Sequence, residues 1–359
     1  MAEALLALCD VRVQHGSSTV LRLHFAVHVG EVVVVIGPNG AGKSTLLRVM
    51  GLLQRPSSGS VYFHGEQATA KNSLAMRRHM ASVFQEPLLL DGTVYDNAAL
   101  GLKLRGFRRD EIERKLRPWL KRLGIDHLTE RRARTLSGGE AQRTSLVRGL
   151  VLDPSLLLLD EPFAALDAPT RETLLLDLRE ILAETGITAV MVTHDLKEAA
   201  ALGQRIGVLH RGELLQLGPQ LEVFRRPVNE AAASIVGMET RIAAVAERTQ
   251  DQITTMRFNG GSVNVRGEFP AGAQVTLCIR PEDIRISRHG DGKSCAKSDI
   301  HIKTKIARIA PSIAEYRISL RADCGCLTAL VSKPSFDGLS LREGDEALAS
   351  FSPDAVHGI

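Results

Sequence analysis

Short runs of consecutive apolar residues mark the strands expected in the first part of the chain. The clearest are Val32–Ile36 and Leu156–Leu159, and the mostly apolar stretch Ile187–Thr193 is of the same kind. Each is too short for a buried helix, and its aliphatic composition is typical of a strand buried on both faces of a parallel sheet. Residues 2–30 read as short alternating strands joined by a Gly16-Ser17-Ser18 turn. The pattern indicates an α/β fold, in which ligands gather at the carboxyl ends of the strands.

A mostly helical segment interrupts this pattern at about residues 90–153. Asp110 can cap one of its helices and Gly124 can end it, whereas Pro118 predicts a kink or a break inside it. The apolar positions that define this helix are Ile112, Leu116, Leu120 and Leu123. We therefore expect a helical subdomain inserted into an α/β domain that covers residues 1–236.

The last part of the chain, residues 237–359, turns strand-rich and contains an internal repeat. Arg241–Ala246 recurs as Lys305–Ala310, and Gly272–Pro281 recurs as Gly344–Pro353. The larger separation of the second pair fits a longer loop in the second copy. Two copies of a short-stranded unit predict one closed or sandwiched all-β domain of OB-like type.

Composition changes this picture little. With 359 residues, 44% apolar and 24% charged, the chain has the size and composition of a soluble protein of two or three domains. No apolar run reaches the roughly 18 residues of a transmembrane helix, so we expect a cytoplasmic protein that needs other subunits to act across a membrane. The net charge of +4 is too small to indicate nucleic-acid binding. The five cysteines show no metal-site spacing.

The segment Gly37-Pro38-Asn39-Gly40-Ala41-Gly42-Lys43-Ser44 matches the phosphate-binding P-loop. It follows a strand and opens a helix, which is the context that the motif requires. Its glycines let backbone N–H groups converge on phosphate oxygens, Lys43 reaches the β- and γ-phosphates, and Ser44 binds Mg²⁺. A purely structural glycine-rich turn would not need this full spacing. The motif therefore predicts a nucleoside triphosphate, with Mg²⁺, at this site.

Two carboxylates, Asp160 and Glu161, follow the apolar run Leu156–Leu159 directly. Alone, they could be a buried strand that ends in an acidic loop. With a P-loop in the same sheet, Asp160 is the candidate second Mg²⁺ ligand, and Glu161 could orient and deprotonate the attacking water. His194 ends the next strand at the same edge, where it could be structural or could contact the nucleotide.

Leu136-Ser-Gly-Gly-Glu140 opens a further helix and has the composition of a second phosphate cradle without a lysine. Upstream of it, the stretch from Lys103 to Arg134 holds 12 Lys and Arg against 5 Asp and Glu. This basic stretch is either a solvated face or a surface attracted to the anionic cytoplasmic leaflet.

Together these motifs make the chain resemble the ATP-binding cassette (ABC) ATPases over about residues 5–235. The corresponding elements are Walker A at Gly37–Thr45, the Q-loop at Gln85, the signature at Leu136–Glu140, Walker B at Leu156–Glu161, the D-loop at Ala165-Leu166-Asp167 and the switch histidine at His194. The resemblance implies ATP as substrate, Mg²⁺ as cofactor, and two cassettes paired head to tail. Each ATP then lies between Walker A of one cassette and the signature of the other.

The same resemblance implies a role for each matching residue. Lys43, Ser44 and Thr45 would hold phosphates and Mg²⁺, and Asp160 would support the metal. Glu161 would be the general base and His194 the γ-phosphate contact. Gln85 would link the metal and the catalytic site to a membrane subunit, while Ser137, Gly138, Gly139 and Asp167 would face the partner's nucleotide. His15 occupies the place of the family's adenine-stacking aromatic residue, usually Tyr, so its stacking on the base would be weaker.

The tail resembles the transport-associated OB-like (TOBE) module of ABC importers, most clearly in Ile279-Arg-Pro-Glu-Asp-Ile284. Its end is similar to the molbindin-type version of molybdate and tungstate systems. That version usually carries Lys-Ala-Thr where this chain has Ser352-Pro353-Asp354, which removes a cation. The tail is therefore either a structural or dimer-contact module or an oxyanion-binding one.

The resemblance implies the ATPase subunit of an importer, peripheral to the cytoplasmic face of the membrane. Its partners would be a second copy of itself, integral-membrane permease subunits and, indirectly, a periplasmic or lipid-anchored solute-binding protein. The implied cargo is a tungstate- or molybdate-type oxyanion. Alternatives are another cargo such as sulfate, polyamine or sugar, a non-transport ABC protein, and an ATPase regulated by a ligand-sensing tail.

Overall fold

The computed structural model describes residues 4–16, 18–288 and 300–359, so that Ser17 of the expected turn lies outside the described residues. The chain forms two compact units, Met1–Val223 and Phe224–Ile359. The second unit thus begins before residue 237. The reason is that the segment after Val223 bonds to the tail: Glu230 accepts a hydrogen bond from Thr276 (2.7 Å), and the carbonyl of Pro227 lies 3.0 Å from His357 Nε2.

One ten-stranded sheet organises the first unit, in the order β5-β4-β1-β2-β10-β9-β3-β8-β7-β6. The strands β3, β8, β7 and β6 are parallel, whereas β1, β2, β4 and β5 form an antiparallel wing. The strand bounds are β1 Ala4–His15, β2 Ser18–His28, β3 Val32–Ile36, β4 Ser58–Phe63, β5 Glu66–Gln67, β6 Met80–Val83, β7 Leu156–Asp160, β8 Thr188–Thr193, β9 Arg205–His210 and β10 Glu213–Pro219. The three apolar runs of the sequence are therefore strands of the parallel part of the sheet, as predicted, and they lie side by side in the order β3-β8-β7.

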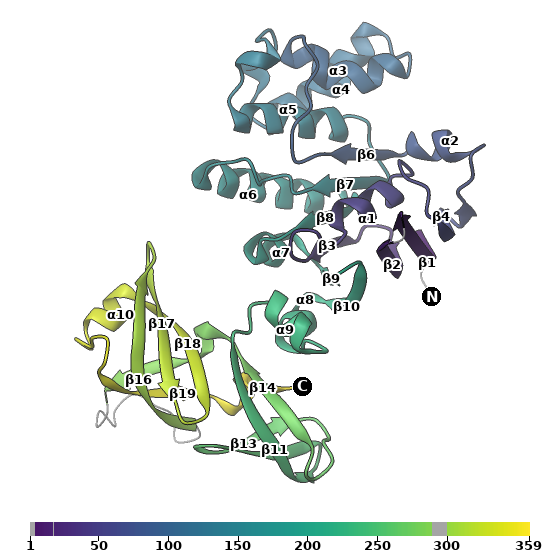
Figure 1. Ribbon diagram of the computed structural model, residues 1–359. Helices are drawn as coiled ribbons and strands as arrows, with labels where there is room; N and C mark the ends of the chain where they lie inside the picture. Colours follow the sequence, from purple (N-terminus) through teal and green to yellow (C-terminus); the bar gives the residue numbers. More distant parts are fainter. Residues whose placement is uncertain (1–3, 17, 289–299) are drawn as a thin grey trace. The chain divides into compact units, whose positions relative to one another are not determined.

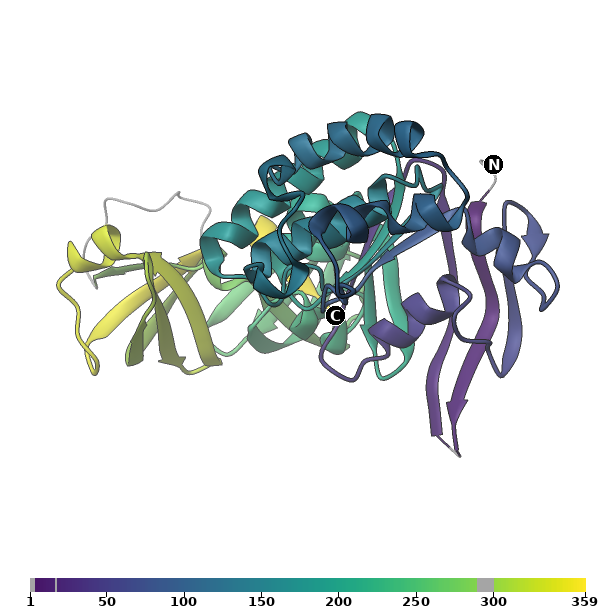
Figure 2. The same cartoon turned by 90° about the horizontal axis from the view of Figure 1, so that it is seen from above.

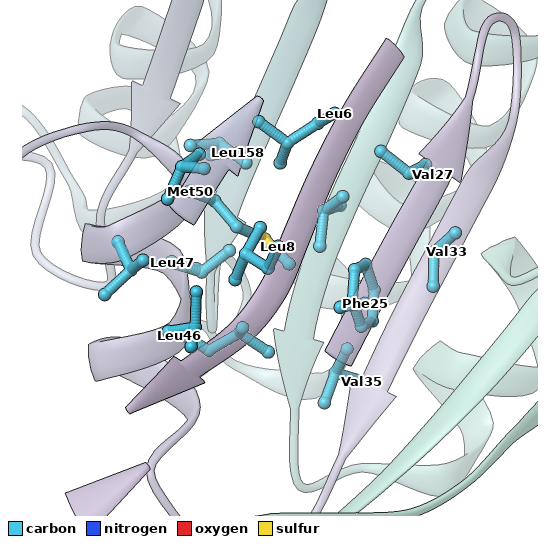
Figure 3. Close-up of a cluster of buried hydrophobic side chains, with 14 of the residues drawn as sticks. Leu6, Leu8, Phe25, Val27, Val33, Val35, Leu46, Leu47, Met50 and Leu158 are labelled. Carbon is cyan, nitrogen blue, oxygen red and sulfur yellow. The ribbon is translucent and has the colours of Figure 1, made fainter. Parts of the chain in front are cut away.

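The main core lies where helix α1 (Lys43–Met50) packs on this sheet. Leu46, Leu47 and Met50 point from α1 towards Leu8 of β1, and Leu158 of β7 completes the contact (Figure 3). All of these side chains are buried. This packing fixes the start of α1, and hence the P-loop before it, against the carboxyl ends of the parallel strands.

The predicted helical insertion is present between β6 and β7 and consists mainly of α3, α4 and α5 (Figures 1 and 2). The helices of this unit, besides α1, are α2 Ser73–Arg77, α3 Val94–Leu104, α4 Arg109–Arg122, α5 Gly138–Leu150, α6 Ala168–Thr185 and α7 Leu196–Leu202, with α8 Gln220–Arg225 at the boundary. Within the described part of the chain, no helix has the length and apolar character needed to cross a bilayer.

Helix α4 corrects two expectations. It begins after Arg108 rather than at Asp110, and Glu111 accepts a hydrogen bond from the Arg108 N–H at 2.9 Å, which completes the N-terminal turn. It also continues through Pro118, so the predicted break is absent. Pro118 is exposed, and the carbonyl that its missing N–H leaves unpaired can therefore be hydrated.

The second unit consists of helix α9 and two five-stranded antiparallel sheets with the same strand order. The first is β13-β12-β11-β14-β20 and the second is β18-β17-β16-β19-β15. Their bounds are α9 Glu230–Ile235, β11 Thr240–Gln250, β12 Ile253–Phe258, β13 Gly261–Arg266, β14 Gln274–Ile279, β15 Arg285–Arg288, β16 Ile300–Pro311, β17 Glu315–Ala322, β18 Gly325–Ser332, α10 Lys333–Asp337, β19 Glu346–Phe351 and β20 His357–Gly358. The last strand of each sheet comes from the opposite half of the tail, because β15 follows β14 in the chain and β20 follows β19.

The two halves correspond in a register that differs from one of the sequence matches. Gly272 N–H bonds to the Ala246 carbonyl (2.7 Å), and Gly344 N–H bonds to the Ile306 carbonyl (2.8 Å). Ile306 therefore occupies the place of Ala246, whereas the match of Arg241–Ala246 to Lys305–Ala310 places Ala310 there. That shorter match is wrong by four residues, while the match of Gly272–Pro281 to Gly344–Pro353 holds.

Candidate nucleotide site

The site lies where β3, β7 and β8 end side by side. Ile36 pairs with Thr193, and Asp160 pairs with Val192. The P-loop, the two carboxylates and His194 consequently leave the sheet at the same edge, as the sequence predicts.

The P-loop passes so close to neighbouring backbone that glycine is required at two of its positions. A Cβ on Gly37 would lie 2.2 Å from the carbonyl oxygen of Leu209. Gly42 has a φ of 102° and precedes the first residue of α1. The loop thus delivers the free N–H groups of the α1 N-terminus, a favourable place for phosphate.

Lys43 extends back over the loop that precedes it and is almost fully buried. Its ammonium group donates hydrogen bonds to the carbonyls of Gly37 (2.9 Å) and Pro38 (3.3 Å). It also forms an ion pair with Glu161 Oε1 at 3.2 Å. A buried ammonium needs such partners because desolvation is costly, and an incoming phosphate can replace the carboxylate.

Ser44 and Asp160 meet next to Lys43. The Ser44 hydroxyl donates to Asp160 Oδ1 at 3.2 Å. Burial raises the pKa of the Asp160 carboxyl, and nearby Glu161 adds to this effect, while the Ser44 hydrogen bond opposes it. A hydroxyl and a carboxylate are the oxygen donors that Mg²⁺ prefers, with phosphate and water supplying the other ligands. These residues therefore fit the metal.

Both carboxylate oxygens of Glu161 have a partner. Oε1 faces Lys43, and Oε2 lies 2.9 Å from His194 Nδ1. Its backbone has a φ of 43°, a left-handed conformation that is uncommon for residues other than glycine, and its N–H bonds to the Val192 carbonyl at 3.0 Å. Such strain is found where surrounding contacts fix a functional side chain.

A small cavity of about 40 Å³ adjoins Glu161 and His194, which is enough for a water molecule. Its wall includes two residues that the sequence did not single out, Arg171 and Glu198. Glu198 is buried and accepts a 2.5 Å hydrogen bond from the hydroxyl of Thr193, and burial raises the pKa of its carboxyl. Arg171 donates to the Leu166 carbonyl in the D-loop (3.1 Å). Only the position of Glu198 one turn after His194 could have indicated a role.

The signature forms the start of α5, as predicted. Ser137 caps the helix: its Oγ accepts a hydrogen bond from Glu140 N–H (3.3 Å), and Glu140 accepts one from Ser137 N–H (2.7 Å). The bond from the Ser137 N–H, together with one that the Ser137 hydroxyl donates to the same carboxylate oxygen (2.9 Å), lowers the pKa of the Glu140 carboxyl. The signature lies against the D-loop of its own chain, since a Cβ on Gly138 would be 3.7 Å from the Ala165 carbonyl.

The structure does not gather all of the expected residues. Among the described residues, no hydrogen bond or ion pair joins Ser137–Glu140 to Gly37–Thr45. Asp167 is the exposed N-cap of α6, without a side-chain bond. Gln85 is exposed beyond the end of β6, and His15 is exposed at the end of β1. The roles expected for Ser137, Gly138, Gly139, Asp167, Gln85 and His15 at the nucleotide and its metal therefore stay predictions.

Two other expectations from the sequence bear on partners. Several basic residues of the helical insertion form ion pairs within the unit, such as Arg122 with Glu180 and Glu184, which favours a solvated face. In the tail, Ser352 accepts a hydrogen bond from the Asp354 N–H (3.3 Å) in a short turn. The segment that stands in place of Lys-Ala-Thr thus forms a local turn, and whether the tail binds an oxyanion stays open to experiment.

Comparison with known proteins agrees with this geometry. The family model described as "ABC transporter" matches residues 20–164. The molybdate/tungstate import ATP-binding protein WtpC of Pyrococcus horikoshii is 37% identical over 93% of this chain and 94% of its own length. The spermidine/putrescine import ATP-binding protein PotA 1 of Pseudomonas aeruginosa is 32% identical over 96% and 92%.

Among solved structures, cbiO1 of Clostridium perfringens, part of the ABC transporter complex cbiONQ, is similar with a TM-score of 0.58 and 29% identity. The match covers 65% of this chain and 94% of that one. The cassette fold, the P-loop and the relatives that match along nearly the whole length lead to one conclusion. The chain belongs to the ABC transporter family, as an ATP-hydrolysing, ATP-binding subunit of the import type.

Proposed function

We propose that two copies of this chain bind ATP between them and couple its hydrolysis to the uptake of a molybdate- or tungstate-type oxyanion through separate permeases. The observation that carries the catalytic part is the arrangement of Glu161, held between Lys43 and His194 beside Ser44 and Asp160. An ammonium group, a hydroxyl–carboxylate pair and a second carboxylate surround one point at the sheet edge, which supports binding of phosphate and metal there with Glu161 as the base.

In this proposal ATP displaces Glu161 from Lys43, because phosphate oxygens carry more negative charge than a single carboxylate. Lys43 and the N–H groups of the P-loop then hold the phosphates, with Thr45 beside them in the first turn of α1. Ser44, Asp160 and Gln85 would hold Mg²⁺, which neutralises charge on the phosphates when bound. The released Glu161 carboxylate orients and deprotonates water, and His194 contacts the γ-phosphate.

The signature supplies the reason for a second copy. Gly138 and Gly139 present their N–H groups at the start of a 13-residue helix, a suitable place for an anion, and the Ser137 hydroxyl lies beside them at the N-cap. They have no bond to the P-loop of their own chain among the described residues. In a head-to-tail pair they would close over the γ-phosphate held by the other copy, together with Asp167 of the adjacent D-loop.

Substituting Glu161 with Gln tests the catalytic part. We expect turnover to fall by about 10² to 10⁴, the usual contribution of a general base, while ATP still binds and holds the dimer together. Sedimentation velocity with ATP and Mg²⁺ would measure the dimer, and phosphate release would measure turnover. Hydrolysis at the wild-type rate would remove Glu161 from the role of base.

The loop Gln85–Leu90 supports the proposed contact with a permease. Leu88 and Leu90 are 58% and 56% exposed, and an apolar partner would cover them. The subunit would then work at the cytoplasmic face of the membrane, where a permease passes on the state of a solute-binding protein outside. No role for nucleic acid is proposed.

The cargo rests on similarity to the WtpC relative, with polyamine as the alternative that the PotA relative favours. Co-purification of the permeases and of their binding protein, followed by elemental and mass analysis of the bound ligand, would decide between them. Bound tungsten or molybdenum supports the oxyanion. A bound polyamine, sulfate or sugar would contradict the oxyanion and identify that ligand as the cargo.

A further inference from the structure

The main link between the loop of residues 85–90 and the signature helix is Arg148 of α5; Gln142 of the same helix donates a longer bond to the carbonyl of Phe84, just before the loop (3.5 Å). Arg148 Nη2 donates to the Pro87 carbonyl at 2.7 Å, and Arg148 Nη1 donates to the Leu88 carbonyl at 3.0 Å. A third bond, from Nη2 to Ser145 Oγ at 3.1 Å, fixes the guanidinium on α5 itself. A planar, forked donor suits two successive carbonyls in a way that a lysine does not.

These hydrogen bonds are the interactions that can offset the partial burial of the Arg148 guanidinium. No carboxylate of the described residues forms an ion pair with it, and burial lowers the pKa of its guanidinium without an opposing acidic neighbour. Removing a cation from water without a counter-ion is costly. The hydrogen bonds to the two carbonyls must therefore offset the free energy that desolvation of the guanidinium costs.

The loop is also held in a conformation that it would not adopt by itself. Leu88 has a φ of 46°, a left-handed conformation that is disfavoured for a bulky side chain. At the far end of the loop, Asn97 of α3 accepts a hydrogen bond from the Leu90 N–H (2.7 Å) and donates to the Leu90 carbonyl (3.0 Å). The exposed side chains of Leu88 and Leu90 therefore stand on a backbone fixed from both ends.

Helix α5 connects the loop of residues 85–90, through Arg148, to the signature residues at its other end. Ser137 caps α5 at one end, and Arg148 lies eleven positions further along, about 16 Å away at 1.5 Å per residue. A helix transmits displacement along its axis as a rigid element. A shift of the Ser137–Gly139 end is therefore delivered to the loop through Arg148.

We propose that Arg148 is a positioning residue that makes the loop 85–90 and the signature end of α5 move together when ATP closes the dimer. The inference rests on the proposed function only in naming ATP and a docked permease as the two ends of this linkage. Within the described ranges, Arg148 forms no hydrogen bond or ion pair with the P-loop residues 37–45.

Hydrogen exchange measures the linkage without any permease. In a Glu161→Gln background, ATP should change the exchange rate of the backbone amides in residues 84–92 of the full-length protein. With Arg148→Gln added, we expect faster exchange in this segment. The ratio of its exchange rates with and without ATP should shrink by about tenfold, which is within the range of measured coupling energies. Arg148→Lys, which can satisfy only one carbonyl well, should fall between the two.

Arg105 provides the matched control. It also donates to main-chain carbonyls, those of Leu152 and Arg78, which lie outside the loop. Arg105→Gln should leave the ATP-dependent exchange of residues 84–92 unchanged. An unchanged response in Arg148→Gln, or an equal loss in Arg105→Gln, would overturn the proposal.

ATP hydrolysis by the complex assembled with its permeases gives the second readout. Arg148→Gln should abolish most of the stimulation of ATP hydrolysis by loaded solute-binding protein, while KM for ATP stays within about threefold of the wild type, since the P-loop is unaltered. A parallel loss of basal and stimulated hydrolysis would indicate a merely structural residue and contradict the proposal. If the wild-type complex transports nothing, the proposed function fails, and the exchange experiment still tests Arg148.

Discussion

At the scale of single residues, the site is organised by competition for Lys43. The ammonium bonds to Glu161, which His194 contacts on its other oxygen. In the proposed function, phosphate takes the place of the Glu161 carboxylate at Lys43. Release of the base would then be tied to the binding of the substrate.

Asp160 gives a residue-scale prediction with a defined pH dependence. Because burial raises the pKa of its carboxyl above 3.8, the folded protein binds this proton more tightly than the unfolded chain does. The contribution of Asp160 to wild-type stability should therefore fall as pH rises from about 3.8 through the raised pKa. Asp160→Asn cannot ionise and still offers an oxygen to Ser44, so the nucleotide-free variant should be more stable than the wild type at pH 7.

Urea unfolding at pH 7 and pH 4 would check this difference, and the advantage of Asp160→Asn should shrink at the lower pH. The same variant should lose Mg²⁺-dependent hydrolysis by about a hundredfold or more, comparable to removal of one essential electrostatic group. A variant that is less stable at pH 7, or equally active, would contradict the assignment.

The sequence predicted the residues whose chemistry depends on local order. Lys43, Ser44, Asp160, Glu161 and His194 follow strands that are recognisable as apolar runs, and neighbouring parallel strands bring their ends together. Arg148 could not be found in this way, because the carbonyls that it bonds belong to a segment distant in sequence. Glu198 has a nearby partner in Thr193, but the sequence does not show that its carboxyl is buried. Their identity as buried or half-buried charged groups is visible only in the fold.

At the scale of elements, α5 has two functional ends. Ser137 and Glu140 cap its start, and Arg148 ties its last turn to the loop before α3. The sequence indicated the cap through the Ser-x-x-Glu spacing. It misjudged α4 because Pro118 faces solvent, where a missing hydrogen bond is tolerated.

Ser137→Ala tests the capping and nucleotide roles of this element together. Loss of the cap should lower the free energy of unfolding by about 1 kcal/mol, measured by urea denaturation. Thr93→Ala is the matched control, because Thr93 forms the same capping box with Asp96 at the start of α3. We expect both variants to lose similar stability, but only Ser137→Ala to lower ATP hydrolysis substantially. Equal loss of hydrolysis in both would remove Ser137 from the nucleotide contact.

At the scale of the whole molecule, the sequence left different features of the two units unpredicted. The ten-stranded sheet follows from apolar patterns, but its antiparallel wing adds strands that are too mixed in polarity to order from sequence. In the tail, a β-bulge lies at Ala246–Arg248 and another at Ile306–Arg308. Repeated Ile and Ala residues near them produced a displaced sequence match, and the exchange of β15 and β20 between the sheets left no sequence signal.

The central claim is that one catalytic site needs two copies of the chain. It is tested by mixing two inactive variants, Lys43→Ala, which lacks the phosphate-binding cation, and Ser137→Arg, which blocks the signature. In a mixed dimer, the intact P-loop of the second variant faces the intact signature of the first. Each variant alone can form no intact site.

The measurement is phosphate release by the two variants alone and in equal mixture, at concentrations that support dimers. We predict that the mixture hydrolyses ATP well above the sum of its components, with one restored site in each mixed dimer. A mixture no more active than that sum, in samples where mixed dimers are shown to form, would contradict the shared site.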